Sequence, residues 1–211
     1  MTTLAELQNH LPGYLSSSGT PELLREIDEQ FPNIHPTRMY TSIYDDEEVV
    51  FQGDGIRELF YVHLPIREIG LWNCVIFSNT CDIDPANKGM YSPAICYAPI
   101  IRLDKYCQAL LDTWKWTTQQ VESHAEAIKT QKLTSAFYLP RGGKLETDFL
   151  VLMDRLCHCD NSSIPRKEIP DRRLFTLSDI GAYLFIFKLS VHFLRMTDRD
   201  IQLAGPPLNP S

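Results

Sequence analysis

Five consecutive residues near the middle of the chain carry the side chains best suited to chemistry. Ser78-Asn79-Thr80-Cys81-Asp82 offers hydrogen-bonding groups and a thiol directly after the apolar run 74–77. Loops that follow a buried strand on a rigid scaffold commonly carry function. We therefore predict a binding loop made of these five residues together with Asp54, which lies in a glycine-flanked turn earlier in the chain.

Cys81 carries the thiol of this loop and is its candidate nucleophile. A reactive thiolate needs a base and a positive environment, whereas the neighbouring Asp82 disfavours the charged sulfur. No histidine, His63 included, stands at a spacing that identifies it as a partner base. The alternative is a polar turn in which Thr80 and Asp82 bond backbone amides and Cys81 packs as a small apolar group. We expect Cys81 to be buried and any function of the loop to be recognition, and no catalytic residue is assigned.

Motifs for metals and cofactors are weak. Cys157-His158-Cys159 has a one-residue gap where zinc sites use two to four. On a strand its two cysteines would share one face and His158 the other. The sequence contains no phosphate-binding loop, no paired-glycine dinucleotide turn and no zinc-protease helix. We predict no metal and no cofactor, and we interpret 141–144 (Arg-Gly-Gly-Lys) as a hairpin turn.

Charge and composition narrow the class of partner. The chain has 211 residues, 44% of them hydrophobic, and a formal net charge of −7, as in an ordinary globular protein. The acidic net charge disfavours nucleic acid as a partner without excluding it, because tight binding to the phosphate backbone needs clustered Lys and Arg side chains. The densest basic segment, 166–173, also contains two acids, and we predict a solvated surface loop there.

The expected compartment is the cytoplasm. The N-terminus lacks the basic and apolar regions of a secretory signal. The most apolar segment, 180–194, is too short to cross a bilayer and contains Lys188 and His192. No membrane partner is predicted, and the 6 cysteines should be reduced.

Apolar patterning predicts a series of strands, most of them between residues 40 and 103. Expected strands lie at 40–44, 49–51, 59–64, 71–78, 94–103, 136–140 and 149–153. The four acids at 45–48 would form a hairpin tip. The early strands follow one another without a helix-length insert, which favours antiparallel pairing in a small barrel or a strongly bent sheet.

Helices are expected at both ends and in the middle. Two helices start at capping signals within 1–36, and they are either a packing arm or a docking element for a partner. A long inserted helix begins at Asp104, with a weak point at Thr117-Thr118. Ser178 caps a last helix that is apolar almost all round, so it is deeply buried or forms an interface. The predicted α+β chain divides into an N-terminal appendage at 1–36, a barrel domain at 37–200 and a flexible tail at 201–211.

The order of three motifs resembles the plasmid-maintenance toxins of the PemK/MazF type. Gly53-Asp54 is followed by Val75-Ile76-Phe77-Ser78 and then by Ala98-Pro99-Ile100. The resemblance covers roughly residues 51 to 103. It implies a small β-barrel, usually dimeric, and many members of that family cut RNA without a metal.

The chain departs from this family at the positions that carry its chemistry. The family places an Arg-Pro pair just before the Val-Ile strand, where Leu71-Trp72-Asn73 stands here. The family's threonine after Pro-Ile is Ile101. The nearest arginines, Arg67 and Arg102, are the predicted anion contacts. The run from Ser78 to Ile83 also resembles a Ser-x-x-Cys-Asp-Ile signature of larger bacterial relatives, which look like accessory parts of conflict systems.

Three hypotheses follow. The first is a non-catalytic protein-binding component of a bacterial toxin–antitoxin-like or antiviral phage-defence system, whose partner is encoded in the same operon. The second is a metal-independent endoribonuclease that kept the fold and moved its catalytic groups. The third is a Cys81-dependent enzyme. Homodimer formation stays open.

Overall fold

The computed structural model describes residues 36–63, 68–87 and 93–194. In this part the chain is an α+β protein with an antiparallel sheet of 8 strands. The strands are β1 (Tyr40–Thr41), β2 (Gly55–His63), β3 (Glu68–Ile76), β4 (Ala94–Arg102), β5 (Ala136–Leu139), β6 (Phe149–Leu152), β7 (Cys157–Asp160) and β8 (Arg173–Leu177). The α-helices are α3 (Leu103–Asp112), α4 (Thr118–Lys129), α5 (Ile169–Arg172) and α6 (Asp179–Leu194), and short 3₁₀ turns lie at Pro36–Arg38, Asn161–Ser163 and Arg166–Glu168.

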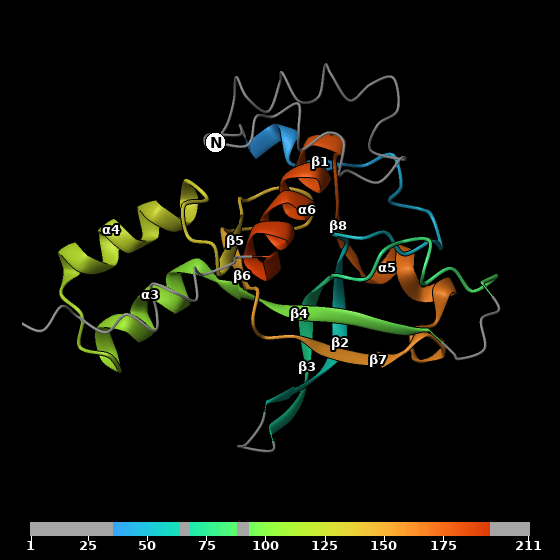
Figure 1. Cartoon of the computed structure of the whole chain (residues 1–211), viewed down its shortest axis with the longest axis horizontal. Coiled ribbons are helices and arrows are strands. Elements are labelled where there is room, and N and C mark those ends of the chain that lie inside the picture. The colour runs from blue at the N-terminus through green and yellow to red at the C-terminus, as the bar shows by residue number, and fades with distance from the viewer. Residues whose placement is uncertain (1–35, 64–67, 88–92, 195–211) are drawn as a thin grey trace, which may run out of the picture.

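The sheet runs in the order β1-β8-β2-β3-β4-β6-β5, with β7 also paired to β4 (Figure 1). On one edge β4 pairs with β3, and on the other it pairs with β7 at its start and β6 at its end. Helix α6 lies over the β5, β6 and β8 part of the sheet, while α3 and α4 extend to one side as a pair (Figure 1). No helix in the described ranges is both long and apolar enough to cross a membrane.

The expected closed barrel is not confirmed, because the sheet is open. Its end strands β1 and β5 form no ladder with each other. Two bonds nevertheless join the two ends: the Tyr40 hydroxyl donates to the carbonyl of Pro140 over 2.7 Å, and the Lys144 amide donates to that of Leu174 over 2.8 Å. Strand β1 has only two residues and Pro140 has no amide hydrogen, so a backbone ladder cannot complete the circle there.

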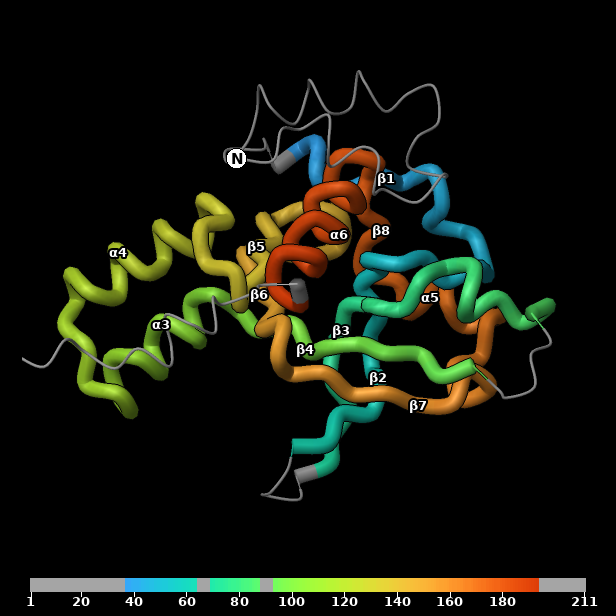
Figure 2. The backbone as a smooth tube through the Cα atoms, in the orientation of Figure 1, coloured from blue at the N-terminus to red at the C-terminus, as the bar shows by residue number. Residues whose placement is uncertain are grey.

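The β2–β3 hairpin extends beyond its neighbours as an arm, which we define as 59–63 and 68–72. Strand β8 pairs with β2 only at Gly55 and Ile56, and β4 pairs with β3 only from residue 74 onward. A bulge in β2 precedes the arm, where Glu58 has φ +60° and the register slips by one residue. The arm therefore projects from the body of the sheet (Figures 1 and 2).

Three apolar clusters form the core. The largest lies between the sheet and α6 and includes Val75, Phe77, Phe137 and Phe185. The second lies under β2, β3, β4 and β7, and the third under α3 and α4. The prediction that 71–78 contains a buried central strand is confirmed at its second half, where residues 74–77 are all buried.

Several predicted elements differ from the structure. The expected strands at 42–44 and 49–51 are absent, and this stretch forms turns. The basic segment is not a surface loop throughout, because it runs through α5 into β8, a buried strand that was not predicted. The long helix is broken between α3 and α4, next to the predicted weak point. Thr117 caps α4 there in a capping box with Gln120.

The Ser178 cap of the last helix is confirmed, but the helix is buried along only part of its surface. Ser178 precedes α6, and its hydroxyl accepts a hydrogen bond from the Gly181 amide at 3.1 Å. Ile180, Leu184 and Phe185 are buried, while Phe187 and Phe193 are exposed. The predicted N-terminal helices and the 201–211 tail lie outside the described residues, as does Arg67.

Candidate functional site

The predicted binding loop is held by its own side chains. The Ser78 hydroxyl accepts from the Cys96 amide at 2.8 Å, which ties the loop to β4. The Thr80 hydroxyl accepts from the Gln52 amide at 3.0 Å. The Asn79 carbonyl oxygen accepts from the Cys81 amide at 2.9 Å, a local turn bond. Three of the polar side chains thus serve to shape the loop.

Asp54 is not exposed with the loop residues 78–82, because its side chain is fully buried. One carboxylate oxygen accepts from the Phe51 amide at 2.9 Å and from the guanidinium of Arg173 at 3.3 Å. Burial raises the pKa of Asp54 to about 6, while Arg173, the Phe51 amide and the Thr176 hydroxyl act in the opposite direction. Asp54 is therefore part of a buried ion pair and is not exposed for binding.

Arg173 overturns the prediction of a solvated basic loop. Its side chain is completely buried, at the first position of β8. Besides Asp54, it donates to the carbonyls of Tyr44, Glu47 and Val49. The acid-rich turn is wrapped around this guanidinium, which explains why residues 42–51 form no strand. An apolar run directly before the Ser178 cap was the signal in the sequence for this strand.

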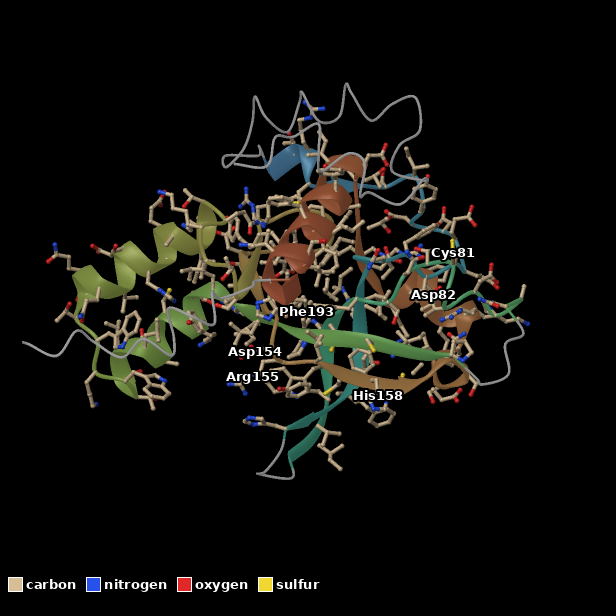
Figure 3. The ribbon with its side chains drawn as sticks, in the orientation of Figure 1. Cys81, Asp82, Asp154, Arg155, His158 and Phe193 are labelled. Carbon is tan, nitrogen blue, oxygen red and sulfur yellow. The ribbon has the colours of Figure 1, made fainter. Side chains whose placement is uncertain are left out.

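Cys81 is exposed, which corrects the expectation that it is buried. No described histidine stands near it. Figure 3 shows Cys81 and Asp82 well apart from His158 and from Phe193, the residue that follows His192. Arg155 also lies far from the loop, and its guanidinium is 3.0 Å from the His63 ring. Helix α4, which carries His124, lies at the opposite side of the molecule (Figure 1). Within the described residues, the loop therefore has no histidine to serve as the base that an activated thiol requires.

Cys157, His158 and Cys159 lie on β7 as the strand hypothesis predicts. The two cysteines pack against the second core cluster and His158 is exposed on the other face. Burial raises the pKa of Cys159, which keeps the thiol protonated. Among the described residues, no group of three or more His, Cys, Asp or Glu side chains is arranged to hold a metal.

Arg102, the second predicted anion contact, already has an ionic partner. Its guanidinium lies 2.6 Å from the carboxylate of Asp104 at the start of α3. It lines a cleft of about 330 Å³ together with Arg57, Asn73 and Lys144. Arg57 was not among the predicted contacts, since only the bulge in β2 sets it beside Asn73.

A larger cleft of about 740 Å³ lies at the gap between the two ends of the sheet. It is lined by the start of β1 and the following turn on one side, and by 141–144 on the other. The predicted hairpin turn is confirmed, with an isolated bridge between Gly142 and Leu145. Lys144 contributes to the walls of both clefts.

The arm carries an exposed apolar face. Phe60 lies opposite Leu71, and Val62 lies opposite Ile69, so these side chains share one face. Their exposed fractions are 61%, 57%, 41% and 68%, in that order. Alternating apolar residues on both strands were the signal for this face, although sequence alone could not show that nothing packs on it in the described structure.

The rest of the protein holds the arm in place. The Tyr97 hydroxyl donates to the Phe60 carbonyl at 2.5 Å, and the Cys157 thiol donates to the Val62 carbonyl at 3.6 Å. On the opposite face of the arm, the rings of Tyr61 and Trp72 are in contact, and the Arg155 guanidinium lies 3.0 Å from the His63 ring. An isolated hairpin is only marginally stable in water, so these contacts explain how the arm keeps its shape.

No protein-family model matches the chain, and no curated protein matches it in sequence.

Proposed function

We propose that the protein is a non-catalytic protein-binding component of a bacterial toxin–antitoxin-like or phage-defence system, built on a distant PemK/MazF-like barrel. The observation that carries the proposal is the apolar face of the arm, made of Phe60, Val62, Ile69 and Leu71. Contiguous exposed apolar side chains on a soluble protein mark interaction surfaces. The PemK/MazF relationship rests on the three short motifs alone.

The arm suits a partner that contributes a strand. Strand β3 has no strand on its outer edge at 68–72 in the described structure, because its pairing with β4 starts at Cys74. An unpaired edge is a template for an added strand, and the neighbouring apolar face supplies the side-chain contacts. The arm is already held by Tyr97 and Cys157, so binding would order few additional residues.

The same structure argues against catalysis at the predicted loop. Ser78, Asn79 and Thr80 are engaged with the backbone, and Cys81 has no described histidine beside it. Leu71-Trp72-Asn73 stands in the place of the Arg-Pro pair of the PemK/MazF-type toxins, and Ile101 in the place of their threonine. A recognition role is consistent with all of these features.

The test combines a double substitution on the arm with a matched control. Phe60→Ser with Leu71→Ser removes two large side chains of the apolar face. Ile43→Ser with Trp114→Ser is the control, which changes two apolar residues elsewhere that are even more exposed. Each full-length variant is co-expressed with the products of the adjacent genes and purified through a tag on the partner. We expect the arm variant to lose the partner and the control to keep it.

Retention of the partner by the arm variant would contradict the proposal. Sedimentation of the protein alone distinguishes a second copy of this chain from a different partner, since a stable dimer broken by the arm substitutions assigns the face to self-association. Deletion of residues 1–36 tests separately whether the N-terminal segment docks the partner.

A second candidate, a metal-independent endoribonuclease, has one specific observation in its favour. Arg57 and Arg102 line the same cleft as Asn73, which ends the stretch 71–73 that stands where the PemK/MazF-type toxins have their Arg-Pro pair. Incubation of the purified protein with total RNA, with and without EDTA, tests it. Cleavage that resists EDTA and is lost in Arg57→Ala but not in Lys105→Ala would replace the binding proposal by this one.

A further inference from the structure

The cleft of about 740 Å³ has the size of a small-molecule site and lies where such sites are common. Its volume falls within the range of ligand pockets in proteins, roughly 300–1,000 Å³. It occupies the gap between β1 and the turn after β5, where the two ends of the sheet approach without pairing. In β-barrels, ligands commonly bind at the mouth, which is also lined by strand ends and loops.

One wall of the cleft presents two cations on a fixed turn. The Arg141 amide donates to the Asp148 carboxylate at 3.0 Å, and the Lys144 amide donates to the Leu174 carbonyl at 2.8 Å. Gly143 has φ +57°, and a Cβ there would lie 2.9 Å from that carbonyl, so the turn requires glycine. The backbone is therefore held against β8 while both long side chains extend from it.

These two cations are available to a ligand. The Arg141 guanidinium has no hydrogen bond or ion pair within the described ranges, and the Lys144 ammonium has only the Pro170 carbonyl at 3.4 Å. Arginine binds phosphate through two parallel hydrogen bonds, and lysine adds a point charge. The remaining acid on this wall, Asp148, is occupied by the Arg141 amide and lies 3.9 Å from the Lys129 ammonium.

The opposite wall has different chemistry. It contains the hydroxyl groups of Thr41 and Ser42 and the carboxylate of Asp45, which is half-buried and has no partner among the residues described. A carboxylate facing a phosphate subsite is suited to accept hydrogen bonds from sugar hydroxyls. Between the walls lies the half-buried ring of Tyr40, packed on Phe175 with ring centroids 4.9 Å apart.

We propose that this cleft binds a nucleoside monophosphate. Arg141 and Lys144 hold the phosphate, Asp45 accepts hydrogen bonds from the ribose hydroxyls, and the base packs on Tyr40. A ligand with all three parts matches both walls and the aromatic residue between them, whereas inorganic phosphate matches only one wall. The net charge of −7 disfavours a long RNA, which would need cations along a much longer track. This inference is independent of the proposed function, because none of these residues lies on the arm.

The test is a calorimetric titration of the full-length protein with AMP, adenosine and inorganic phosphate. Arg141→Ala with Lys144→Ala removes both cations from exposed positions. Lys105→Ala with Lys132→Ala removes the same charge from exposed positions outside the cleft. We expect AMP to bind the wild type and the control equally, and the Arg141/Lys144 variant at least about tenfold more weakly. Adenosine should bind much more weakly than AMP.

Asp45→Asn tests the wall that contains Asp45 separately from the wall that contains the two cations. We expect it to weaken AMP by about threefold to tenfold while leaving phosphate affinity unchanged, because only AMP carries ribose hydroxyls. Tighter binding of both ligands by this variant would mean that Asp45 repels the anion, which overturns the assignment. The proposal is also overturned if AMP does not bind at millimolar concentration, if the cation variant binds like its control, or if a single-stranded RNA binds and AMP does not displace it.

Discussion

At the scale of single residues, the buried pair of Asp54 and Arg173 is the most consequential contact in the described structure. Both side chains are fully buried, and they lie 119 positions apart in the sequence. Removing one partner of such a pair leaves the other charge buried and uncompensated. Arg173 additionally fixes the carbonyls of the acid-rich turn, so its loss affects that whole segment.

Arg173→Met should lower the free energy of unfolding by about 3–5 kcal/mol, the usual cost of breaking a buried ion pair. Lys167→Met, at an exposed position in the same basic segment, should change it by less than about 0.5 kcal/mol. Urea denaturation followed by circular dichroism measures both. An Arg173 variant as stable as the Lys167 variant would show that the pair is not formed.

The titration of Asp54 gives a second residue-scale prediction. Burial raises its pKa from 3.8 to about 6, so between these values the folded protein holds a proton that the unfolded chain has released. Its contribution to stability is therefore complete below pH about 4 and is lost as the pH rises to about 6. Relative to Asp54→Asn, the wild type should lose up to about 3 kcal/mol from pH 3 to pH 7.

Urea denaturation at several pH values checks this difference between the two proteins. A wild type that instead gains stability over the same range, relative to Asp54→Asn, would mean that the charge of Arg173 outweighs the effect of burial.

At the scale of elements, Lys188 joins α6 to the end of α4. It is almost fully buried in an apolar helix, and its ammonium donates to the carbonyls of Gln131, at 2.8 Å, and Leu133. These carbonyls follow the C-terminal end of α4, where Gln131 has φ +56°. A donor from a neighbouring helix satisfies backbone groups that the chain reversal leaves unpaired. The sequence showed Lys188 only as an interruption in an apolar run.

Lys188 should make stability depend on alkaline pH. Burial lowers its pKa from 10.5 to about 8, so between these values the unfolded chain holds a proton that the folded protein has lost. The wild type should therefore become more stable, relative to Lys188→Met, as the pH rises from 8 to 10. The measurement is urea denaturation across this range, and equal pH dependence of the two proteins would contradict it.

At the scale of the whole molecule, the ends of the sheet are joined by side chains instead of a ladder. The Tyr40 hydroxyl reaches the Pro140 carbonyl from the opposite end of the strand order. Burial raises the pKa of Tyr40, so this hydroxyl keeps its proton and stays a donor. The cleft proposed to bind a nucleotide lies beside this bond, and Tyr40 lines it.

Tyr40→Phe should therefore destabilise the protein by about 1 kcal/mol, the net value of one hydrogen bond. It should also speed amide hydrogen exchange in β1 and β5 together, since the bond couples both ends. Tyr183→Phe, at a half-buried position on α6, is the control and should change neither. Faster exchange in β1 alone would show that the two ends are not coupled.

Much of the local structure was predictable because its signals lie within a few residues. The apolar runs at 74–77 and 95–101 form β3 and β4, and the Ser178 cap starts α6. The two β-branched residues at 117 and 118 mark the break between α3 and α4, and the Arg-Gly-Gly-Lys stretch forms its turn. Each of these depends on period, caps or turn residues, which a sequence displays directly.

Only the tertiary structure decided which side chains are buried and which are free. It buried Asp54 and Arg173 together and exposed Cys81. It also left the sheet open, with an apolar arm on one side and a polar cleft at the gap. These features arise from pairing between residues distant in the chain, and the free energy of such contacts depends on neighbours that no local pattern identifies.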